Sequence, residues 1–206
     1  MLLYNGPKRA KLTVALAHGA GAPMDTPFMT FFAEGIAEAG YRVARFEFPY
    51  MAARRSEGRK KPPDRAPVLL QTWRDVIAEI DGPVVIGGKS MGGRMASLIA
   101  ADNPPEAVRG LVCLGYPFYG AGRKDKPRTE HLAAIKVPTL ICQGTRDPMG
   151  DREAVTALTL RRNIRVTWAE DGDHDLKPRK ASGRTADDNW RQALDAITAL
   201  LPRWAP

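Results

Sequence analysis

Short apolar runs alternate with amphipathic helical patterns along nearly the whole chain, and this alternation constrains the fold more than any other feature of the sequence. Six runs, several of them apolar throughout, are expected to form strands: residues 12–17, 42–48, 84–86, 111–114, 139–142 and 165–168. Continuously apolar strands are typical of a parallel sheet that is covered on both faces. The sequence therefore predicts an α/β fold, a three-layer α/β/α sandwich with about six mostly parallel strands.

Capping and helix-breaking residues mark where the helices begin and end. Thr26 is an expected N-cap with Pro27 at the first helical position, and Gly40 ends the same helix. A later helix begins at Ser90 and stops at residues 103–105, because proline cannot continue a helix. Apolar residues at helical spacing predict further helices near 69–80, 154–158 and 190–201. Ligands of such sheets bind at the carboxyl ends of the strands, so functional residues are expected there.

A serine motif stands at one of these strand ends. The segment Gly88-Lys89-Ser90-Met91-Gly92 follows the third expected strand and opens a helix, which is the strand-turn-helix context of a G-x-S-x-G nucleophile elbow. The glycines are needed because side chains two residues before and after the serine would collide with neighbouring backbone. The motif is not a phosphate loop, since the Walker pattern is not met. We predict that Ser90 is a nucleophile at the carboxyl edge of the sheet.

A serine hydroxyl needs a neighbouring base, and the base needs an acid that orients it. Of the three histidines, His174 follows the last expected strand, in a loop that can reach Ser90. Asp147 follows the preceding strand, and the chain order Ser90, Asp147, His174 is the order found in α/β-hydrolases. Asp173 and Asp175 are alternative partners for His174, and a solvated loop histidine among acids is the alternative role of His174 itself.

The segment after the first expected strand, residues 18–22, consists mostly of small residues that let backbone amides approach a substrate. We expect the N–H groups of Met91 and Ala20 to form an oxyanion hole. His18 is expected to brace this loop by hydrogen bonding, and His131 to begin a short helix that faces solvent. We expect Gly19, Gly21 and Tyr116 to contact the substrate. Gly19 or Gly21 could also provide the oxyanion N–H in place of Ala20.

The composition excludes several classes of function. Lys and Arg exceed Asp and Glu by 31 to 23, a net charge of +8, but the basic stretches 54–61 and 177–184 hold no aromatic residue. We therefore expect no nucleic-acid partner and, without a long apolar run, no membrane segment. Histidine and cysteine spacings predict no metal site, and no cofactor motif is present. Cys113 and Cys142 are expected to be reduced thiols of a cytoplasmic protein without a secretory signal.

Motifs spread over nearly the whole chain resemble one family. The resemblance rests on HGAGA, FEFPYM, RKKPPDR, GGKSMGGRMAS, CQGTRDPMG and DGDHDL. The chain resembles small α/β-hydrolases of the dienelactone-hydrolase-like bacterial branch, which is related to testis-expressed protein 30 and to the third subunit of the non-specific lethal complex. It departs from dienelactone hydrolases proper, whose nucleophile is cysteine, because position 90 is serine. Compared with larger hydrolases, the two usual leading strands are expected to be missing.

These features predict one domain over residues 1–206 that acts as a serine hydrolase on a small ester. Residues 115–137 are too few for a lid, so an open pocket is expected. The basic stretch 54–61 is expected on the active-site face, where it would attract an anionic substrate, and a solvated mobile loop is its alternative role. The alternative functions are a thioesterase or peptidase of the same fold, and a catalytically idle hydrolase fold used as an interaction module, as the eukaryotic relatives suggest.

Overall fold

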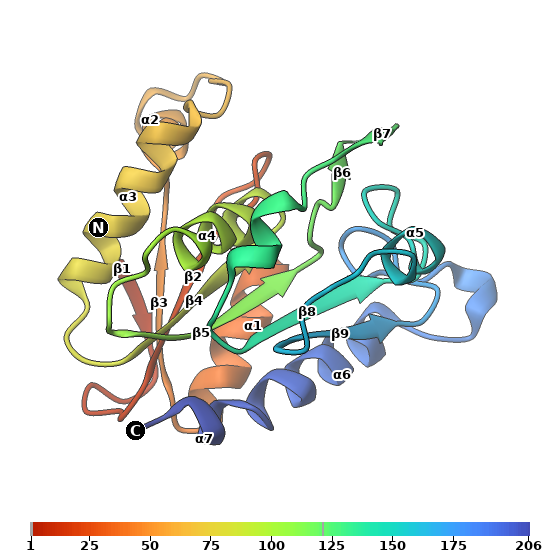
Figure 1. Ribbon diagram of the computed structural model, residues 1–206. Helices are drawn as coiled ribbons and strands as arrows, with labels where there is room; N and C mark the ends of the chain where they lie inside the picture. Colours follow the sequence, from red (N-terminus) through yellow and green to blue (C-terminus); the bar gives the residue numbers. More distant parts are fainter. Residues whose placement is uncertain (1, 121) are drawn as a thin grey trace.

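A seven-stranded sheet forms the middle layer of the molecule (Figure 1). The structure is a computed structural model that describes residues 2–120 and 122–206. The strands lie in the order β1-β3-β2-β4-β5-β8-β9, and all neighbours are parallel except β1 and β3. Their bounds are β1 (Leu2–Asn5), β2 (Thr13–Ala17), β3 (Arg42–Phe46), β4 (Val84–Lys89), β5 (Val108–Leu114), β8 (Thr139–Gly144) and β9 (Ile164–Ala169). The mostly parallel α/β sheet is therefore confirmed.

The edge strand β1 corrects one expectation. No strand is predicted before residue 12, yet β1 pairs antiparallel with β3 and so provides one leading strand. Its residues Leu2, Leu3 and Tyr4 are apolar, but the strand is only four residues long, and Leu3 and Tyr4 are exposed. It is held by its ladder to β3 and by Tyr4, whose ring lies 3.8 Å from the guanidinium carbon of Arg42.

Helices cover both faces of the sheet because each strand sends alternate side chains to opposite sides. In β2, Val14 and Leu16 enter one apolar cluster, whereas Ala15 and Ala17 enter the other. The first cluster is closed by α1 (Pro27–Glu38), α6 (Ala186–Thr198) and α7 (Leu201–Trp204). The second is closed mainly by α3 (Ala66–Glu79), α4 (Met91–Ala101), the short helix η1 (Glu130–Ala134) and α5 (Arg152–Thr156). The result is the three-layer sandwich that the alternation predicted.

The predicted start and end of the first helix are confirmed. The Thr26 hydroxyl accepts a hydrogen bond from the N–H of Met29 at 3.3 Å, and Pro27 begins α1. Gly40, with φ of +90°, lies just beyond the helix in the left-handed region that favours glycine. This end of α1 matters for the site, because Thr26 and Pro27 line the pocket described below.

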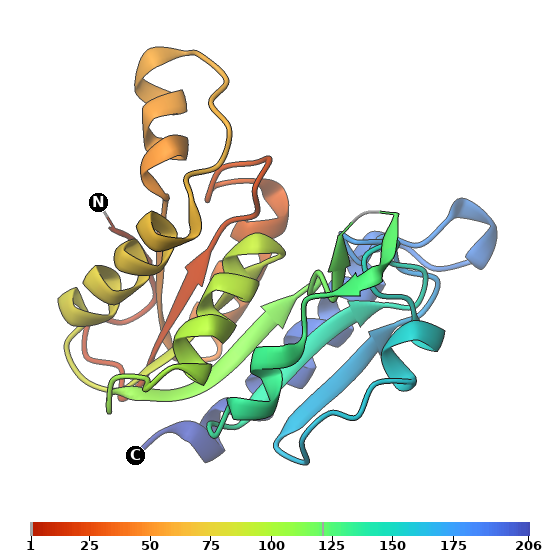
Figure 2. The same cartoon turned by 45° about the horizontal axis from the view of Figure 1, so that its top comes forward.

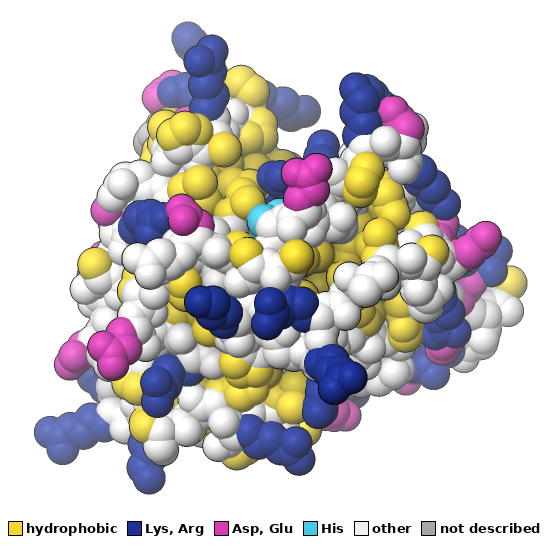
Figure 3. Space-filling view, in the orientation of Figure 1, with side chains coloured by type: hydrophobic (Ala, Val, Ile, Leu, Met, Phe, Trp, Pro, Cys, Tyr) yellow, Lys and Arg dark blue, Asp and Glu magenta, His cyan; other side chains and the backbone are white. Residues whose placement is uncertain are grey.

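Two segments project from the body of the molecule in Figure 1, and Figure 2 shows the first of them most clearly. One contains α2 (Pro49–Glu57), and the other is the hairpin of β6 (Tyr119–Gly120) and β7 (Arg123–Pro127). Lys and Arg side chains gather at both tips, and hydrophobic side chains line the hollow between them (Figure 3). No lid covers the carboxyl edge of the sheet in the part of the chain that the structure describes. None of the helices described there is long and apolar enough to cross a membrane.

Candidate active site

Ser90 occupies a tight turn between the last residue of β4 and the first of α4. Its φ of 51° and ψ of −115° are unusual for a residue with a side chain, which indicates the strain expected of a nucleophile elbow. A Cβ on Gly88 or on Gly92 would overlap with the Ala17 carbonyl oxygen on the adjacent strand β2. The predicted need for both glycines is therefore confirmed, and the turn presents Ser90 beside the carboxyl end of β2.

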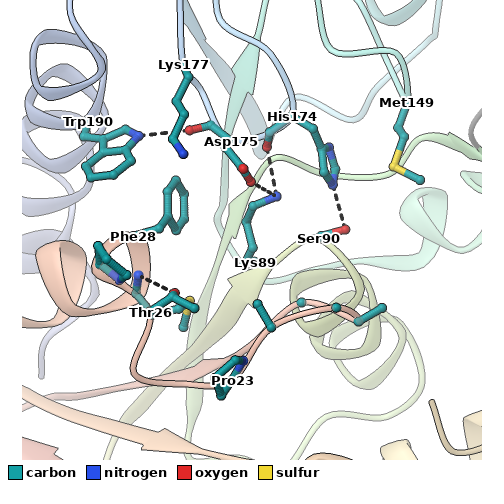
Figure 4. A pocket seen from close by; sticks show the side chains of 16 residues that line it. Pro23, Thr26, Phe28, Lys89, Ser90, Met149, His174, Asp175, Lys177 and Trp190 are labelled. Atoms are coloured by element: carbon teal, nitrogen blue, oxygen red, sulfur yellow. Dashed lines mark hydrogen bonds and ion pairs between the residues drawn. The ribbon is translucent and has the colours of Figure 1, made fainter. Parts of the chain in front are cut away.

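The structure brings the three predicted residues together. His174 Nε2 lies 2.8 Å from Ser90 Oγ, and His174 Nδ1 lies 2.7 Å from Asp147 Oδ2 (Ser90 and His174 are shown in Figure 4). An ionised Asp147 can only accept a hydrogen bond, so the Nδ1 atom carries the proton and Nε2 is left to accept from the serine hydroxyl. This is the tautomer that a general base requires.

The buried carboxylate of Asp147 is fixed by a residue that the sequence analysis missed. Asp147 is fully buried, and its oxygens accept hydrogen bonds from Gln143 Nε2 and from the N–H of Met149, both at 2.8 Å. Gln143 is itself fully buried at the end of β8 and also bonds the backbone of Tyr116 in both directions. The one feature of the sequence that could have pointed to Gln143 is that this polar residue directly follows the apolar run 139–142.

The two alternative acids have other partners. Asp173 Oδ1 accepts the backbone N–H groups of Asp175 and Lys177, at 2.8 and 2.9 Å, and so shapes the histidine loop. The Asp175 carboxylate lies 3.2 Å from the ammonium of Lys89. Asp147, not either of these, therefore contacts the His174 ring.

Lys89, the residue before Ser90, connects the elbow to the histidine loop. Its side chain is only 10% exposed, and its ammonium donates a hydrogen bond to the His174 carbonyl oxygen at 2.9 Å (Figure 4). Burial lowers the pKa of Lys89, and the Asp175 carboxylate partly opposes this effect. A buried lysine with these partners holds the backbone of His174 against the strand that carries the nucleophile. Sequence reasoning treated Lys89 only as the variable position of the motif.

His18 braces the glycine-rich loop, as expected. The ring is fully buried, and Nε2 accepts a hydrogen bond from the N–H of Phe48 at 3.1 Å, so the proton lies on Nδ1 and is donated to the Gly19 carbonyl at 2.7 Å. Burial lowers the pKa of His18, which favours this neutral form. Tyr50 donates its hydroxyl to the Ala20 carbonyl at 2.9 Å. The Gly19 carbonyl that His18 holds belongs to the same peptide group as the Ala20 N–H. Because C=O and N–H point in opposite directions in a trans peptide, the Ala20 N–H points away from His18.

A pocket of about 470 Å³ opens beside Ser90 and His174 (Figure 4). Gly19, Ala20 and Gly21 line it, as expected for the loop after β2. Met91 lies at the start of α4, where backbone N–H groups have no partner within the helix. The remaining wall is mostly apolar and includes Pro23, Pro27, Phe28, Met29, Met149 and Trp190.

The expectations for Tyr116 and His131 need correction. Tyr116 is fully buried and does not line the pocket, because its hydroxyl lies 3.1 Å from both Ser97 Oγ and His131 Nε2. His131 does lie in the first turn of the short helix η1, as predicted, but it is half-buried and its ring turns inward, with Nε2 2.8 Å from Ser97 Oγ. Burial and the neighbouring Arg94 lower the pKa of His131 to about 4. These residues form a buried polar cluster behind α4 instead of a substrate site.

The basic stretch 54–61 is likewise not part of the pocket. The first half of the stretch belongs to the helix α2, so the alternative prediction of a mobile loop is wrong for this half. Arg55 pairs with Asp25 and Glu47, and Lys61 pairs with Glu57. In the described part of the chain, two of the five basic side chains of this stretch are therefore paired with carboxylates.

The described residues contain no group of three or more His, Cys, Asp or Glu side chains placed to hold a metal ion. Cys113 and Cys142 are buried free thiols. Burial raises the pKa of Cys142 to about 12, and the pKa of Cys113 is raised still further for the same reason. Neither is placed to act as a thiolate nucleophile.

Comparisons with known proteins agree with this fold. Residues 10–201 match the family described as alpha/beta hydrolase domain. An alpha-beta serine hydrolase homologue from Coxiella burnetii is 18% identical, with 95% of this chain and 90% of that chain covered and a TM-score of 0.72. A lidless a/b serine hydrolase from Xanthomonas campestris is 20% identical (100% and 89% covered, TM-score 0.72), and dienelactone hydrolase from Anabaena variabilis is 21% identical (98% and 89%, TM-score 0.68). The chain belongs to the alpha/beta hydrolase domain family.

Proposed function

We propose that the protein is a serine hydrolase that cleaves a small carboxylic ester through an acyl-enzyme on Ser90. The observation that carries the proposal is the continuous hydrogen-bonded series from Ser90 Oγ through His174 to the buried Asp147, located at the mouth of a pocket. The fold is shared with serine hydrolases from Coxiella burnetii and Xanthomonas campestris. A buried, oriented acid and a neutral base in contact with a serine are the parts that acyl transfer requires.

The reaction proceeds in two balanced halves. Ser90 Oγ attacks the ester carbonyl while His174 Nε2 takes the hydroxyl proton, and collapse of the tetrahedral intermediate breaks the ester C–O bond as His174 returns the proton to the leaving alcohol. Water then attacks the acyl-enzyme with the same base, which releases the carboxylic acid and regenerates Ser90. Asp147 stabilises the imidazolium that forms in each half.

The oxyanion of each intermediate is assigned to two backbone donors. Met91 N–H belongs to the first turn of α4, and Ala20 N–H belongs to a peptide whose carbonyl is held by His18. Fixed donors of this kind do not reorganise during the reaction, so removal of one costs roughly a hundredfold or more in kcat. The neutral tautomer of His18 supports this arrangement, because protonation of Nε2 would break its bond to Phe48.

The proposed substrate is a small ester. The pocket has a volume of about 470 Å³, and no lid closes over it in the described part of the chain, so it can enclose little of a substrate, which favours a small ester. A cytoplasmic location, the absence of a nucleic-acid partner and membership of the branch related to testis-expressed protein 30 stay predictions. Thioester and amide substrates would use the same residues, so they are compared directly in the assay.

A fluorophosphonate probe tests the proposal. We expect the wild-type protein to be labelled covalently, and labelling to be lost in Ser90→Ala and strongly reduced in His174→Ala. Ser182→Ala is the matched control, since Ser182 is exposed and lies outside the pocket. Parallel assays with ester, thioester and amide substrates of one acyl group identify the preferred bond. A folded wild-type protein that is neither labelled nor active on any of them would refute a hydrolase role and favour an interaction module.

A further inference from the structure

The pocket continues from Ser90 toward an aromatic end. The rings of Phe28, from α1, and Trp190, from α6, meet there with centroids 5.3 Å apart and planes at 85°. Figure 4 shows these rings on the far side of Lys89 from Ser90. The Trp190 ring is held by its N–H, which donates to the Asp175 carbonyl at 2.9 Å. An apolar arm of a substrate bound at Ser90 would therefore pack against fixed aromatic surface.

Apart from His174, the charged side chains that line this pocket are those of Lys89, Asp175 and Lys177, so two positive charges face one negative charge. Lys89 and Asp175 form an ion pair at 3.2 Å, which leaves the ammonium of Lys177. Within residues 2–120 and 122–206, no carboxylate pairs with Lys177. The nearby Asp171 is paired with Arg146 and Arg179, and Asp173 accepts backbone N–H groups. The aromatic end of the pocket therefore has one uncompensated positive charge.

Contacts of both the backbone and the ammonium define the position of Lys177. Its backbone N–H is bonded to Asp173 Oδ1 at 2.9 Å, and its ammonium lies 5.9 Å from the centroid of the Trp190 ring. The ammonium is exposed at the pocket mouth, so it can accept an anionic partner without the cost of burying an unpaired charge. Figure 4 shows it on the Trp190 side of the pocket.

We propose that Lys177 binds a carboxylate carried by the substrate, so that the substrate class is an ester with an apolar arm that ends in a carboxylate. The inference rests on the serine hydrolase activity proposed above. The apolar arm would lie against Phe28 and Trp190, and its carboxylate would meet Lys177 at the mouth. The carboxylate takes no part in bond making or breaking, and the acyl-transfer steps are unchanged.

The first test compares two para-nitrophenyl esters of the same length, the neutral hexanoate and the adipate monoester, whose terminal methyl is replaced by a carboxylate. A partly exposed charge pair contributes modestly, so we expect Lys177→Met to lower the ratio of kcat/KM for the adipate monoester to kcat/KM for the hexanoate by about three- to tenfold. Lys177→Glu should lower it further, and about 0.5 M salt should weaken the wild-type preference. Lys180→Met is the matched control, an exposed lysine outside the pocket. An unchanged ratio of the two esters in Lys177→Met overturns the inference.

The second test does not depend on turnover. In the Ser90→Ala variant, binding of monoethyl adipate and of ethyl hexanoate is followed by titration calorimetry, with and without Lys177→Met. Tighter binding of the carboxylate ester that is lost with Lys177→Met supports the inference even if the wild-type protein is inactive, whereas equal binding of the two esters overturns it. Absence of probe labelling at Ser90 with lysine-dependent carboxylate binding would overturn only the proposed catalysis.

Discussion

Replacement of Lys89 by Met separates catalytic geometry from stability. Met retains the apolar stem but removes the ammonium that bonds the His174 carbonyl and faces Asp175. A hydrogen bond from a charged donor contributes about 1.5–3 kcal/mol, whereas the pair with the half-exposed Asp175 contributes about 0–1 kcal/mol. If the larger contribution holds the histidine loop in its reactive position, kcat should fall by about 10- to 100-fold.

The same substitution should not lower the melting temperature. Burial of the Lys89 ammonium is itself costly, as its lowered pKa indicates, and an apolar side chain of similar length avoids this cost. The assay measures kcat and KM on para-nitrophenyl acetate together with the Tm, with Lys136→Met as an exposed control. We expect kcat to fall, KM to stay within about twofold and Tm to be unchanged or higher. A kcat equal to that of the wild type, or a loss of kcat matched by a loss of Tm, would show that Lys89 does not position His174.

Three other substitutions test the remaining structural arguments. Gly88→Ala should cost more than about 3 kcal/mol or prevent folding, because its Cβ would meet the Ala17 carbonyl at a φ of +145°, whereas Gly21→Ala, with open space around the new Cβ, should leave the Tm unchanged. Asp147→Asn should lower kcat by about 10³–10⁴-fold without a comparable loss of Tm, since an amide favours the wrong histidine tautomer. His131 has a folded pKa of about 4 against 6.5 for the unfolded chain, so the unfolded state binds the proton first as the pH is lowered. Stability should therefore fall by at most about 2 kcal/mol between neutral pH and pH 5. Urea unfolding at neutral pH and near pH 5 should show a smaller difference in His131→Gln, with a residual slope from His18.

The sequence predicted the elements whose residues carry their own local signal. Six parallel strands were found because each contains a short run rich in apolar residues, several of these runs being continuous, and α1 was found because Thr26, Pro27 and Gly40 mark its limits. The strand β1 and the helix α2 were missed for the opposite reason. The residues of β1 are few and exposed, and α2 is rich in basic residues, with only Tyr50 and Met51 buried. Both are fixed by contacts with distant parts of the chain, which no local pattern records.

The same division applies to the candidate site. Ser90 was identified by glycine spacing, and Asp147 and His174 by their positions after two parallel strands. Gln143 and Lys89 were missed because they act through partners that only the folded chain brings near, namely the Asp147 carboxylate and the His174 carbonyl. Tyr116 was misassigned because its position at the end of β5 suggested the active-site edge, whereas its side chain turns into the core behind α4.

The strand order also determines when the protein can become active during folding. Ser90 and His174 are 84 residues apart in the sequence, and the histidine follows β9, the outermost strand, which pairs only with β8. The elbow can form once β2, β4 and β5 are together, but its base arrives only after β8 and then β9 have been added to the edge. Contacts of such large sequence separation form slowly because of loop-closure entropy. Recovery of activity on refolding is therefore a kinetic signal for the docking of the C-terminal third, and a chain that stalls before that step keeps an intact elbow without a base.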